Sequence, residues 1–474
     1  MNAPGRLVID LAIILLLIVG VALFRSPRRA RAGNLIAAFA LLCAALMAFY
    51  HERLFAPAAV LIALSLGAGV GYWVAMKVDM VRIPSMVAFQ NGAGGLAACL
   101  VAFVELSGEA APLPAANIVG GVLAIAFGAV TFSGSMIATS KLSGILRQTP
   151  VKLPGHSILL SGLAVAAVVF GVMSGLSAPA STVFLLGLIA VTLGVGVVFS
   201  VRIGGADMPV LISFLNAGTG LAAAFCGVVI QNRFLIVCGA LVGASGSILT
   251  LAMCRAMNRN LAKVLAGLDA RLADVSESFF HTESVPPSEP DDDRSPLDRA
   301  AEAMKDAGSV IIVPGYGMAL AQAHFDVVKL ARDLEEAGKA VCFAIHPVAG
   351  RMPGHMNVLL AEADVDYEML HQMDEINPRF KETDLAIVVG ACDVVNPAAI
   401  NVEGTPISGM PILHVHEASR VVVCNLDDKP GYSGVDNPLY QNPRAILLFD
   451  EARASIGRLS EALAAAQNDT TGGV

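Results

Sequence analysis

The first 260 residues of this 474-residue chain carry little negative charge, because only six of its 39 acidic residues lie there. None of the nine histidines falls inside the apolar stretches of that part, and none of the eight cysteines has a C-x-x-C spacing. We therefore expect the cysteines to be small buried apolar side chains rather than disulfides or metal ligands. The net charge of −8 belongs to the second half, so no nucleic-acid partner is expected.

Nine apolar stretches fill the first part, and each is long enough to cross a bilayer, which takes about 20 helical residues. The expected spans are 7–24, 33–50, 55–76, 83–106, 117–139, 157–174, 182–201, 208–229 and 234–256. Basic residues from Arg25 onward follow the first stretch in place of a small-residue cleavage site, so we interpret it as an anchor. The predicted fold class is a polytopic all-α membrane bundle of nine transmembrane helices, residues 1–260, followed by an α/β doubly wound domain.

Basic residues fall in alternate connections between the stretches, as at Arg28, Lys77, Lys141, Arg202 and Arg255. Such residues favour the cytoplasmic side because they translocate poorly. This pattern predicts an N-terminus outside the cell and, after nine crossings, a cytoplasmic C-terminal domain.

A gapless internal repeat relates Pro84–Ala98 to Pro209–Ala223 and gives Asn91 and Asn216 equivalent positions. These asparagines either belong to a hydrogen-bonded proton pathway or hold helices together beside small-residue faces. Asp207, just before the second copy, is the nearest titratable side chain. It either takes part in proton coupling or is simply solvated.

Residues 261–296 are polar and rich in proline, which predicts a flexible linker. From 297 to 474, apolar runs of strand length alternate with helical patterns, which indicates a Rossmann-like doubly wound sheet. The predicted strands are Val310–Val313, Val341–Ile345, Leu385–Val389, Ile412–Val415, Val421–Cys424 and Ala445–Phe449.

A glycine-rich turn, Gly315-Tyr316-Gly317, follows the first strand and precedes a predicted helix, Ala321–Ala337. Glycines allow backbone N–H groups at a helix start to approach a pyrophosphate, so the turn favours a dinucleotide site. Leu320 replaces the third glycine of the usual fingerprint, which puts close helix–strand packing in question.

The second strand ends without the carboxylate that binds a ribose diol. Arg351, in the loop that follows, either meets a phosphate or is an ordinary surface residue, and the missing acid is compatible with a 2′-phosphorylated nucleotide. His414 and His416 would project from one face of the fourth predicted strand, but no third ligand has a matching spacing, so we expect no metal.

Four motifs then occur in order: Val313–Ala319 (VPGYGMA), His346–Ala363 (HPVAGRMPGHMNVLLAEA), Gly390–Ala398 (GACDVVNPA) and Gly431–Leu439 (GYSGVDNPL). With Met208-Pro209 and Ala256–Arg259, they resemble the β subunit of proton-translocating NAD(P)+ transhydrogenases over essentially the whole chain.

The resemblance implies that this chain binds NADP(H), that a partner α subunit binds NAD(H), and that hydride passes directly between them while protons cross a bacterial inner membrane. It also implies a dimer of heterodimers. No side-chain catalyst is expected, because the cofactors supply the chemistry. The alternative is a nucleotide-regulated membrane transporter without hydride transfer.

The resemblance also assigns site residues. Around the phosphates it implies Gly315, Tyr316, Gly317, Met318, Ala319, His346, Ala349, Arg351, Met352, Pro353 and Gly354; in the nicotinamide half, Gly390, Ala391, Cys392 and Asp393; and in a loop over the cofactor, Gly431 and Tyr432. Asp393 is the candidate for proton coupling in this domain, because a carboxylate after a buried strand can have a raised pKa. Its other interpretation is an N-cap of the following helix.

This chain departs from the family pattern at two places. Some members carry histidine where Asn91 stands. A Lys-Arg-Ser run that grips the 2′-phosphate in the family aligns with Asn425, Leu426 and Asp427, followed by Asp428 and Lys429. Two carboxylates repel a phosphate unless cations offset them, so either Lys429 substitutes or selectivity for NADP(H) is relaxed.

Overall fold

The computed structural model describes residues 3–23, 27–51, 57–78, 82–108, 114–146, 151, 155–176, 182–204, 207–257, 261, 294–350, 354–403, 405, 407–431 and 433–471. The chain divides into two compact units. The first comprises Met1–Ser140, Pro154–Ser200 and Ser213–Ile248, and the second comprises Lys141–Leu153, Val201–Ile212 and Leu249–Val474.

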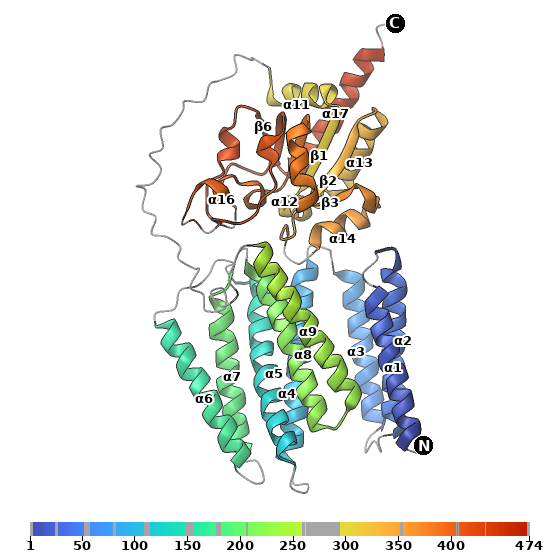
Figure 1. The fold of residues 1–474 in the computed structure, drawn as a ribbon, viewed down its shortest axis with the longest axis vertical. Coiled ribbons are helices and arrows are strands. Elements are labelled where there is room, and N and C mark those ends of the chain that lie inside the picture. The colour runs from blue at the N-terminus through green and yellow to red at the C-terminus, as the bar shows by residue number, and fades with distance from the viewer. Residues whose placement is uncertain are drawn as a thin grey trace. The chain divides into compact units, whose positions relative to one another are not determined.

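Long apolar helices occupy every predicted span (Figure 1). They are α1 (Ala3–Leu23), α2 (Pro27–His51), α3 (Pro57–Lys77), α4 (Ile83–Ser107), α5 (Ala115–Leu142), α6 (His156–Leu176), α7 (Thr182–Val201), α8 (Met208–Val229) and α9 (Arg233–Ala256). Among the described residues, eight helices are long and apolar enough to cross a membrane, whereas the apolar part of α1, Leu7–Leu23, is shorter. The prediction of membrane helices is confirmed, and the count of nine spans stays a prediction.

Glycines at equivalent positions of the internal repeat make close helix contacts. A Cβ on Gly95 of α4 would lie 2.8 Å from the carbonyl oxygen of Gly128 on α5. At the equivalent position in the second copy, a Cβ on Gly220 of α8 would lie 2.8 Å from the Cα of Gly243 on α9. Each copy therefore packs backbone to backbone against the helix that follows it in sequence, as small residues permit in membranes.

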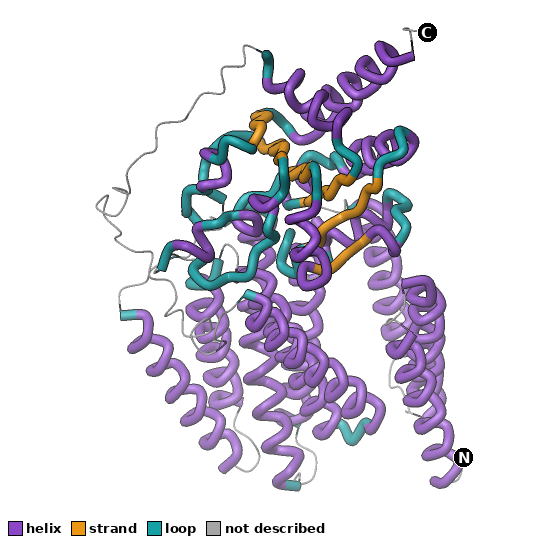
Figure 2. The backbone as a smooth tube through the Cα atoms, turned by 45° about the horizontal axis from the view of Figure 1, so that its top comes forward, coloured by secondary structure: helices purple, strands orange, loops and turns teal. Residues whose placement is uncertain are grey.

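A six-stranded parallel sheet forms the centre of the second unit, in the order β3-β2-β1-β4-β5-β6 (strands orange in Figure 2). The strands are β1 (Ser309–Pro314), β2 (Ala340–Ile345), β3 (Leu370–Gln372), β4 (Leu385–Val389), β5 (Arg420–Asn425) and β6 (Ala445–Phe449). The predicted doubly wound sheet is confirmed. One predicted strand, Ile412–Val415, is wrong, and the short β3 was not predicted.

The run Ile412–Val415 is apolar because it is buried, although it joins no strand. Ile412, Leu413 and Val415 are each no more than 1% exposed. The side chain of Asn377 supplies the hydrogen bonds that a neighbouring strand would give: its Nδ2 donates to the carbonyl of Ile412 at 2.9 Å, and its Oδ1 accepts from the N–H of His414 at 3.1 Å. Burial without pairing to a strand produces the same apolar pattern as a buried strand.

Helices cover both faces of the sheet. The larger ones are α11 (Pro296–Asp306), α13 (His324–Glu336), α14 (His355–Glu362) and α17 (Ala452–Thr471), and the short ones are α12 (Tyr316–Leu320), α15 (Met373–Ile376), α16 (Ala398–Asn401), η3 (Tyr367–Met369), η4 (Asn377–Glu382), η5 (Asp393–Val395), η6 (Val415–Glu417) and η7 (Pro438–Gln441). On one face, Val313, Val388 and Val423 share a core with Phe380 of η4. Helices α11, α13 and α17 pack against one another and against the strands.

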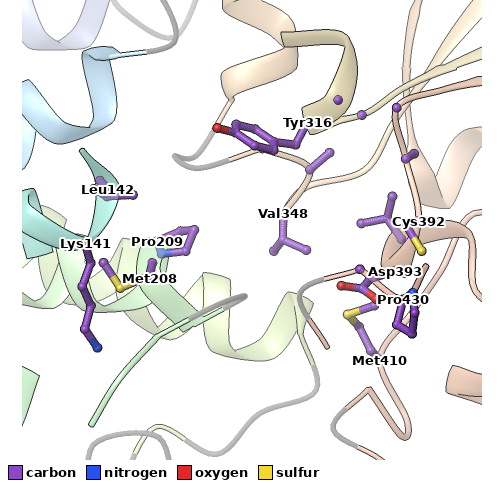
Figure 3. A pocket seen from close by; sticks show the side chains of 18 residues that line it. Lys141, Leu142, Met208, Pro209, Tyr316, Val348, Cys392, Asp393, Met410 and Pro430 are labelled. Carbon is purple, nitrogen blue, oxygen red and sulfur yellow. The ribbon is translucent and has the colours of Figure 1, made fainter. Parts of the chain in front are cut away.

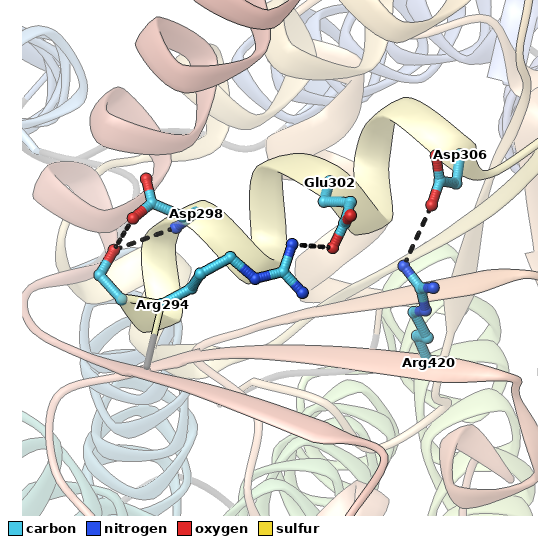
Figure 4. A network of polar contacts seen from close by, with 6 residues as sticks. Arg294, Asp298, Glu302, Asp306 and Arg420 are labelled. Carbon is cyan, nitrogen blue, oxygen red and sulfur yellow. Dashed lines mark hydrogen bonds and ion pairs between the residues drawn. The ribbon is translucent and has the colours of Figure 1, made fainter. Parts of the chain in front are cut away.

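Helix α11 begins at Pro296, the last residue of the predicted linker 261–296, of which residues 262–293 lie outside the described residues. Ser295 caps it by accepting from the N–H of Asp298 (Figure 4). Arg294 pairs with Glu302 at 2.8 Å and Asp306 with Arg420 at 3.5 Å, all at exposed side chains. Because exposed ion pairs contribute little, the Ser295 cap and the buried face of α11 do more than these pairs to stabilise the start of the helix.

Candidate functional site

The turn after β1 lies directly against the turn after β4. The N–H of Gly315 donates to the carbonyl of Val389, and the N–H of Gly317 donates to that of Gly390, each at 2.8 Å. Gly390 has φ +65°, and a Cβ there would overlap the backbone nitrogen of Met318. The three glycines are therefore required because two backbones meet at the carboxyl edge of the sheet.

The helix after this turn begins earlier than predicted and is interrupted. In place of one helix over Ala321–Ala337, the chain forms α12 and then α13, separated by Gln322 with φ +51°. That left-handed residue breaks the helical hydrogen-bond series. Leu320 is 60% exposed, whereas Met318 and Ala319 are fully buried, so Leu320 does not occupy the close-packed position that its place in the fingerprint suggested.

The phosphate-side residues that the sequence named fall into three groups. Met318, Ala319 and Ala349 are buried, and of the three only Ala349 lines the cavity described below. Gly350 and Gly354 have positive φ values, and Tyr316 is half-buried. Arg351, Met352 and Pro353, like Tyr432 of the later loop, lie outside the described residues.

His346 is fully engaged inside the protein. Its Nε2 lies 2.8 Å from the carbonyl of Pro411, so it carries the proton and donates, and its Nδ1 accepts from the N–H of Val348 at 3.2 Å. The side chain is 2% exposed, and burial lowers the pKa of His346 to about 4. The neutral imidazole therefore ties the loop after β2 to Pro411 and leaves neither ring nitrogen for a phosphate.

This environment predicts a pH-dependent stability. The ordinary pKa of 6.5 falls to about 4 on folding, so the unfolded chain binds a proton that the folded chain excludes. The free energy of unfolding is therefore highest above pH 6.5 and falls by about 3 kcal/mol as the pH drops towards 4. Urea unfolding of the C-terminal unit between pH 4 and 7 should show this slope, and His346→Gln should flatten it. An unchanged slope in that variant, with His371→Gln as the control, would contradict the assignment.

Asp393 contacts the 430–437 loop, which contains all but the last two residues of the fourth motif. Its Oδ1 accepts from the Oγ of Ser433 at 2.5 Å, and its Oδ2 accepts from the N–H of Ser433 at 3.1 Å. A Cβ on Gly431 would lie 2.9 Å from the carboxyl group, so a larger residue there would force the Asp393 carboxylate to shift. The N-cap of η5 is Cys392, without a side-chain cap bond, so the N-cap interpretation of Asp393 is wrong.

A second group of polar contacts lies beneath that loop. Asn425, 7% exposed, donates from Nδ2 to the carbonyl of Ala391 at 2.9 Å and to the hydroxyl of Tyr440 at 2.7 Å. The Tyr440 hydroxyl donates to the Sγ of Cys392 at 3.5 Å. Burial raises the pKa of the Cys392 thiol, which keeps it protonated at neutral pH. Asn425 is thus a structural link between the ends of β4 and β5.

Asp427 and Lys429, on the exposed segment after β5, form an ion pair at 2.8 Å. The hydrogen bond from Lys429 lowers the pKa of Asp427, and the same bond raises the pKa of Lys429. The ammonium that the sequence suggested for a 2′-phosphate is therefore engaged with the neighbouring carboxylate.

The turns after β1 and β4 border a cavity whose wall includes Gly315, Gly317, Gly390, Asp393 and Gly431. Figure 3 shows the side chains of Tyr316, Val348, Cys392, Asp393, Met410 and Pro430 around it. Because Gly315, Gly317 and Gly390 leave no room for a Cβ, a ligand can approach the main chain closely at this part of the wall. A pyrophosphate-bearing dinucleotide fits this wall, which lies where the strand order reverses between β1 and β4.

In the membrane unit, the two repeat asparagines are not joined by a hydrogen bond between their described side chains. The backbone oxygen of Asn91 instead accepts from the Oγ1 of Thr219, one helical turn after Asn216, at 3.1 Å. Asn91 Nδ2, Ser135 Oγ on α5 and Ser200 Oγ on α7 are buried without a hydrogen-bond partner among the described residues. Asp207 directly precedes α8.

The histidine pair does not have the predicted setting. His414 lies outside any strand and His416 lies in η6, with ring centroids 5.7 Å apart. The described residues contain no group of three or more His, Cys, Asp or Glu side chains arranged to hold a metal. Sequence reasoning also missed Ser433 and Tyr440; Ser433 lay within a quoted motif, but nothing in its spacing pointed to Asp393.

A bundle of apolar helices joined to a doubly wound sheet with a glycine-walled carboxyl edge defines the class: a multi-pass membrane protein with a dinucleotide-fold domain. Residues 7–462 match the family model described as NAD(P) transhydrogenase beta subunit. The chain is 39% identical over 447 residues to NAD(P) transhydrogenase subunit beta of Rhodospirillum rubrum, covering 92% of this chain and 94% of that protein. The protein of the same name from a designated strain of that organism gives the same figures. The chain belongs to the NAD(P) transhydrogenase beta subunit family and has an oxidoreductase role as a transhydrogenase subunit.

Proposed function

We propose that this chain is the NADP(H)-binding and proton-translocating subunit of a transhydrogenase, in which hydride passes directly between NADH on a partner α subunit and NADP+ here. The observation that carries the proposal is the backbone-walled edge at Gly315, Gly317 and Gly390 in a chain of this family. Bound NADP(H) supplies the hydride chemistry. The residues of this chain supply position and electrostatics, and no side-chain catalyst takes part.

The proposed division of labour follows the sequence. Residues 1–260 form the proton-translocating membrane domain, 261–296 a linker and 297–474 the nucleotide domain. The N-terminus lies outside a bacterial inner membrane and the nucleotide domain lies in the cytoplasm, in a dimer of heterodimers. The alternation of basic residues supports this orientation.

Coupling requires that protonation change the relative affinity for NADP+ and NADPH. If protonation changed both affinities equally, the redox state of the nucleotide could not be linked to proton movement. Asp393 is the proposed coupling group in the nucleotide domain, since its carboxylate holds Ser433 of the 430–437 loop and lines the cavity. Loss or gain of a proton on Asp393 would change those hydrogen bonds, and with them the loop that borders the site.

In the proposed membrane domain, residues 1–260, the pathway runs past Asn91 and Asn216, with Asp207 at its cytoplasmic end. The buried polar atoms of Asn91, Ser135 and Ser200 support it, because polar groups at membrane depth need water or a partner. An asparagine orients water and does not store a proton. The proton-storing group therefore lies elsewhere along the pathway.

The test is to co-express the chain with its α subunit, seal the complex in vesicles and follow reduction of NADP+ by NADH with and without an uncoupler. We expect turnover only when both subunits are present, and an equilibrium that shifts with the imposed gradient. A rate and an equilibrium that ignore the gradient would refute proton coupling. Nucleotide-gated ion flux without hydride transfer would instead identify a regulated transporter.

A further inference from the structure

The segment Asn425–Lys429 carries chemistry that bears on which dinucleotide the proposed site selects. It leaves the carboxyl end of β5, the strand next to β4. Asn425 at its start bonds to the carbonyl of Ala391, and Pro430 and Gly431, directly after its end, line the cavity. The segment therefore connects the sheet edge to the wall of the cavity.

The charge of this segment disfavours the binding of a phosphate. Lys429 Nζ pairs with Asp427 Oδ2 at 2.8 Å, and the N–H of Lys429 also donates to Asp427 Oδ1 at 3.2 Å. Asp428 adds a second carboxylate, so the segment carries two negative charges and one positive charge. The side-chain amide nitrogen of Asn425 already donates to the carbonyl of Ala391 and the hydroxyl of Tyr440. Leu426 is apolar and 72% exposed, so its side chain offers no hydrogen bond.

The next strand exit provides no spare cation. Asp450, the first residue after β6, pairs with Arg458 at 2.8 Å. At the described exits of β5 and β6, each cation thus has a carboxylate partner. A 2′-phosphate would have to share one of these cations with the carboxylate that it already holds, and that carboxylate repels the phosphate.

NADP(H) and NAD(H) differ in one group on the adenosine ribose, a 2′-phosphate in place of a 2′-hydroxyl. A phosphate needs cations, whereas a hydroxyl donates to a carboxylate that follows a strand. Asp427 is such a carboxylate, and its partner Lys429 keeps it ionised. The segment after β5 therefore offers a hydroxyl a better partner than it offers a phosphate.

Building on the proposed function, we propose that Asp427 sets the dinucleotide selectivity of this chain: it accepts from a ribose 2′-hydroxyl, holds the charge of Lys429, and so brings the affinities for NADPH and NADH within about tenfold of each other. Selectivity is relaxed by a carboxylate–ammonium pair rather than by loss of the site.

The experiment titrates the full-length chain in detergent with NADPH and with NADH, following the fluorescence of the reduced nicotinamide. Asp427→Asn keeps the side-chain shape, removes the charge and releases Lys429. We expect it to tighten NADPH about tenfold and to weaken NADH about fivefold. Asp428→Asn is the matched control, because it makes the same change in net charge without releasing Lys429, and it should change the NADPH to NADH ratio by less than about threefold. Adding Lys429→Met to Asp427→Asn should cancel the gain for NADPH.

The outcomes separate this inference from the proposed function. A wild-type chain that prefers NADPH more than a hundredfold, or equal shifts in the Asp427→Asn and Asp428→Asn variants, overturns the role of Asp427 while leaving NADP(H) binding intact. A chain that binds neither nucleotide, while its thermal unfolding shows an intact domain, overturns the proposed function as well.

Discussion

Replacing Gly390 with alanine should abolish NADPH binding and cost about 3 kcal/mol or more of the stability of the C-terminal unit. The cost has two parts. A left-handed φ of +65° disfavours any side chain. The added Cβ would also overlap the backbone nitrogen of Met318, and a backbone atom cannot rotate aside as the end of a side chain can. Thermal unfolding and a fluorescence titration with NADPH measure the two effects in the same sample.

Gly338→Ala separates these two parts. Gly338 has φ +80° but open space around its Cβ position, so its substitution carries only the backbone penalty, about 1 kcal/mol, and should leave NADPH affinity unchanged. If Gly390→Ala behaved like Gly338→Ala, the contact between the turns after β1 and β4 would not be what shapes the cavity.

Replacing Asn91 with leucine should lower gradient-driven reduction of NADP+ by more than tenfold while leaving NADPH binding and thermal stability close to wild type. Leucine has the same number of side-chain heavy atoms in the same branched arrangement, so the change of shape is small, but the buried amide disappears from the bundle. Sealed vesicles that contain the α subunit provide the assay, with NADPH titration of the detergent-solubilised chain as the check on folding.

The matched control is Gln90→Leu, which removes an amide from an exposed position of the same helix and should keep normal coupled turnover. Full gradient-dependent turnover in Asn91→Leu would show that Asn91 only holds α4 against its neighbours, which is the alternative that the sequence left open.

The apolar pattern located the helices and strands because it reflects which residues are buried. Every predicted membrane span coincides with a helix, and five of the six predicted strands are present. The pattern gave wrong strand predictions where burial and strand pairing do not coincide. Ile412–Val415 is buried without joining the sheet, whereas β3 contains His371 and Gln372 and is too short to show any alternation.

The sequence located the glycine turns, but it contained no information about which groups they meet. The bond between Asp393 and Ser433 joins residues 40 positions apart, and the ion pair of Asp427 with Lys429 depends on how one exposed segment turns. Nor could spacing reveal that His346 has both ring nitrogens engaged inside the domain. Contacts of this kind depend on tertiary structure, which local patterns do not encode.

Backbone contact between α4 and α5, and between α8 and α9, restricts how the bundle can rearrange. With Gly95 against Gly128 and Gly220 against Gly243, no side chains separate the paired helices at these points, so a larger residue at any of the four positions would push its pair apart. A rearrangement that kept both pairs intact would move one pair past the other where the Oγ1 of Thr219 on α8 donates to the backbone oxygen of Asn91 on α4.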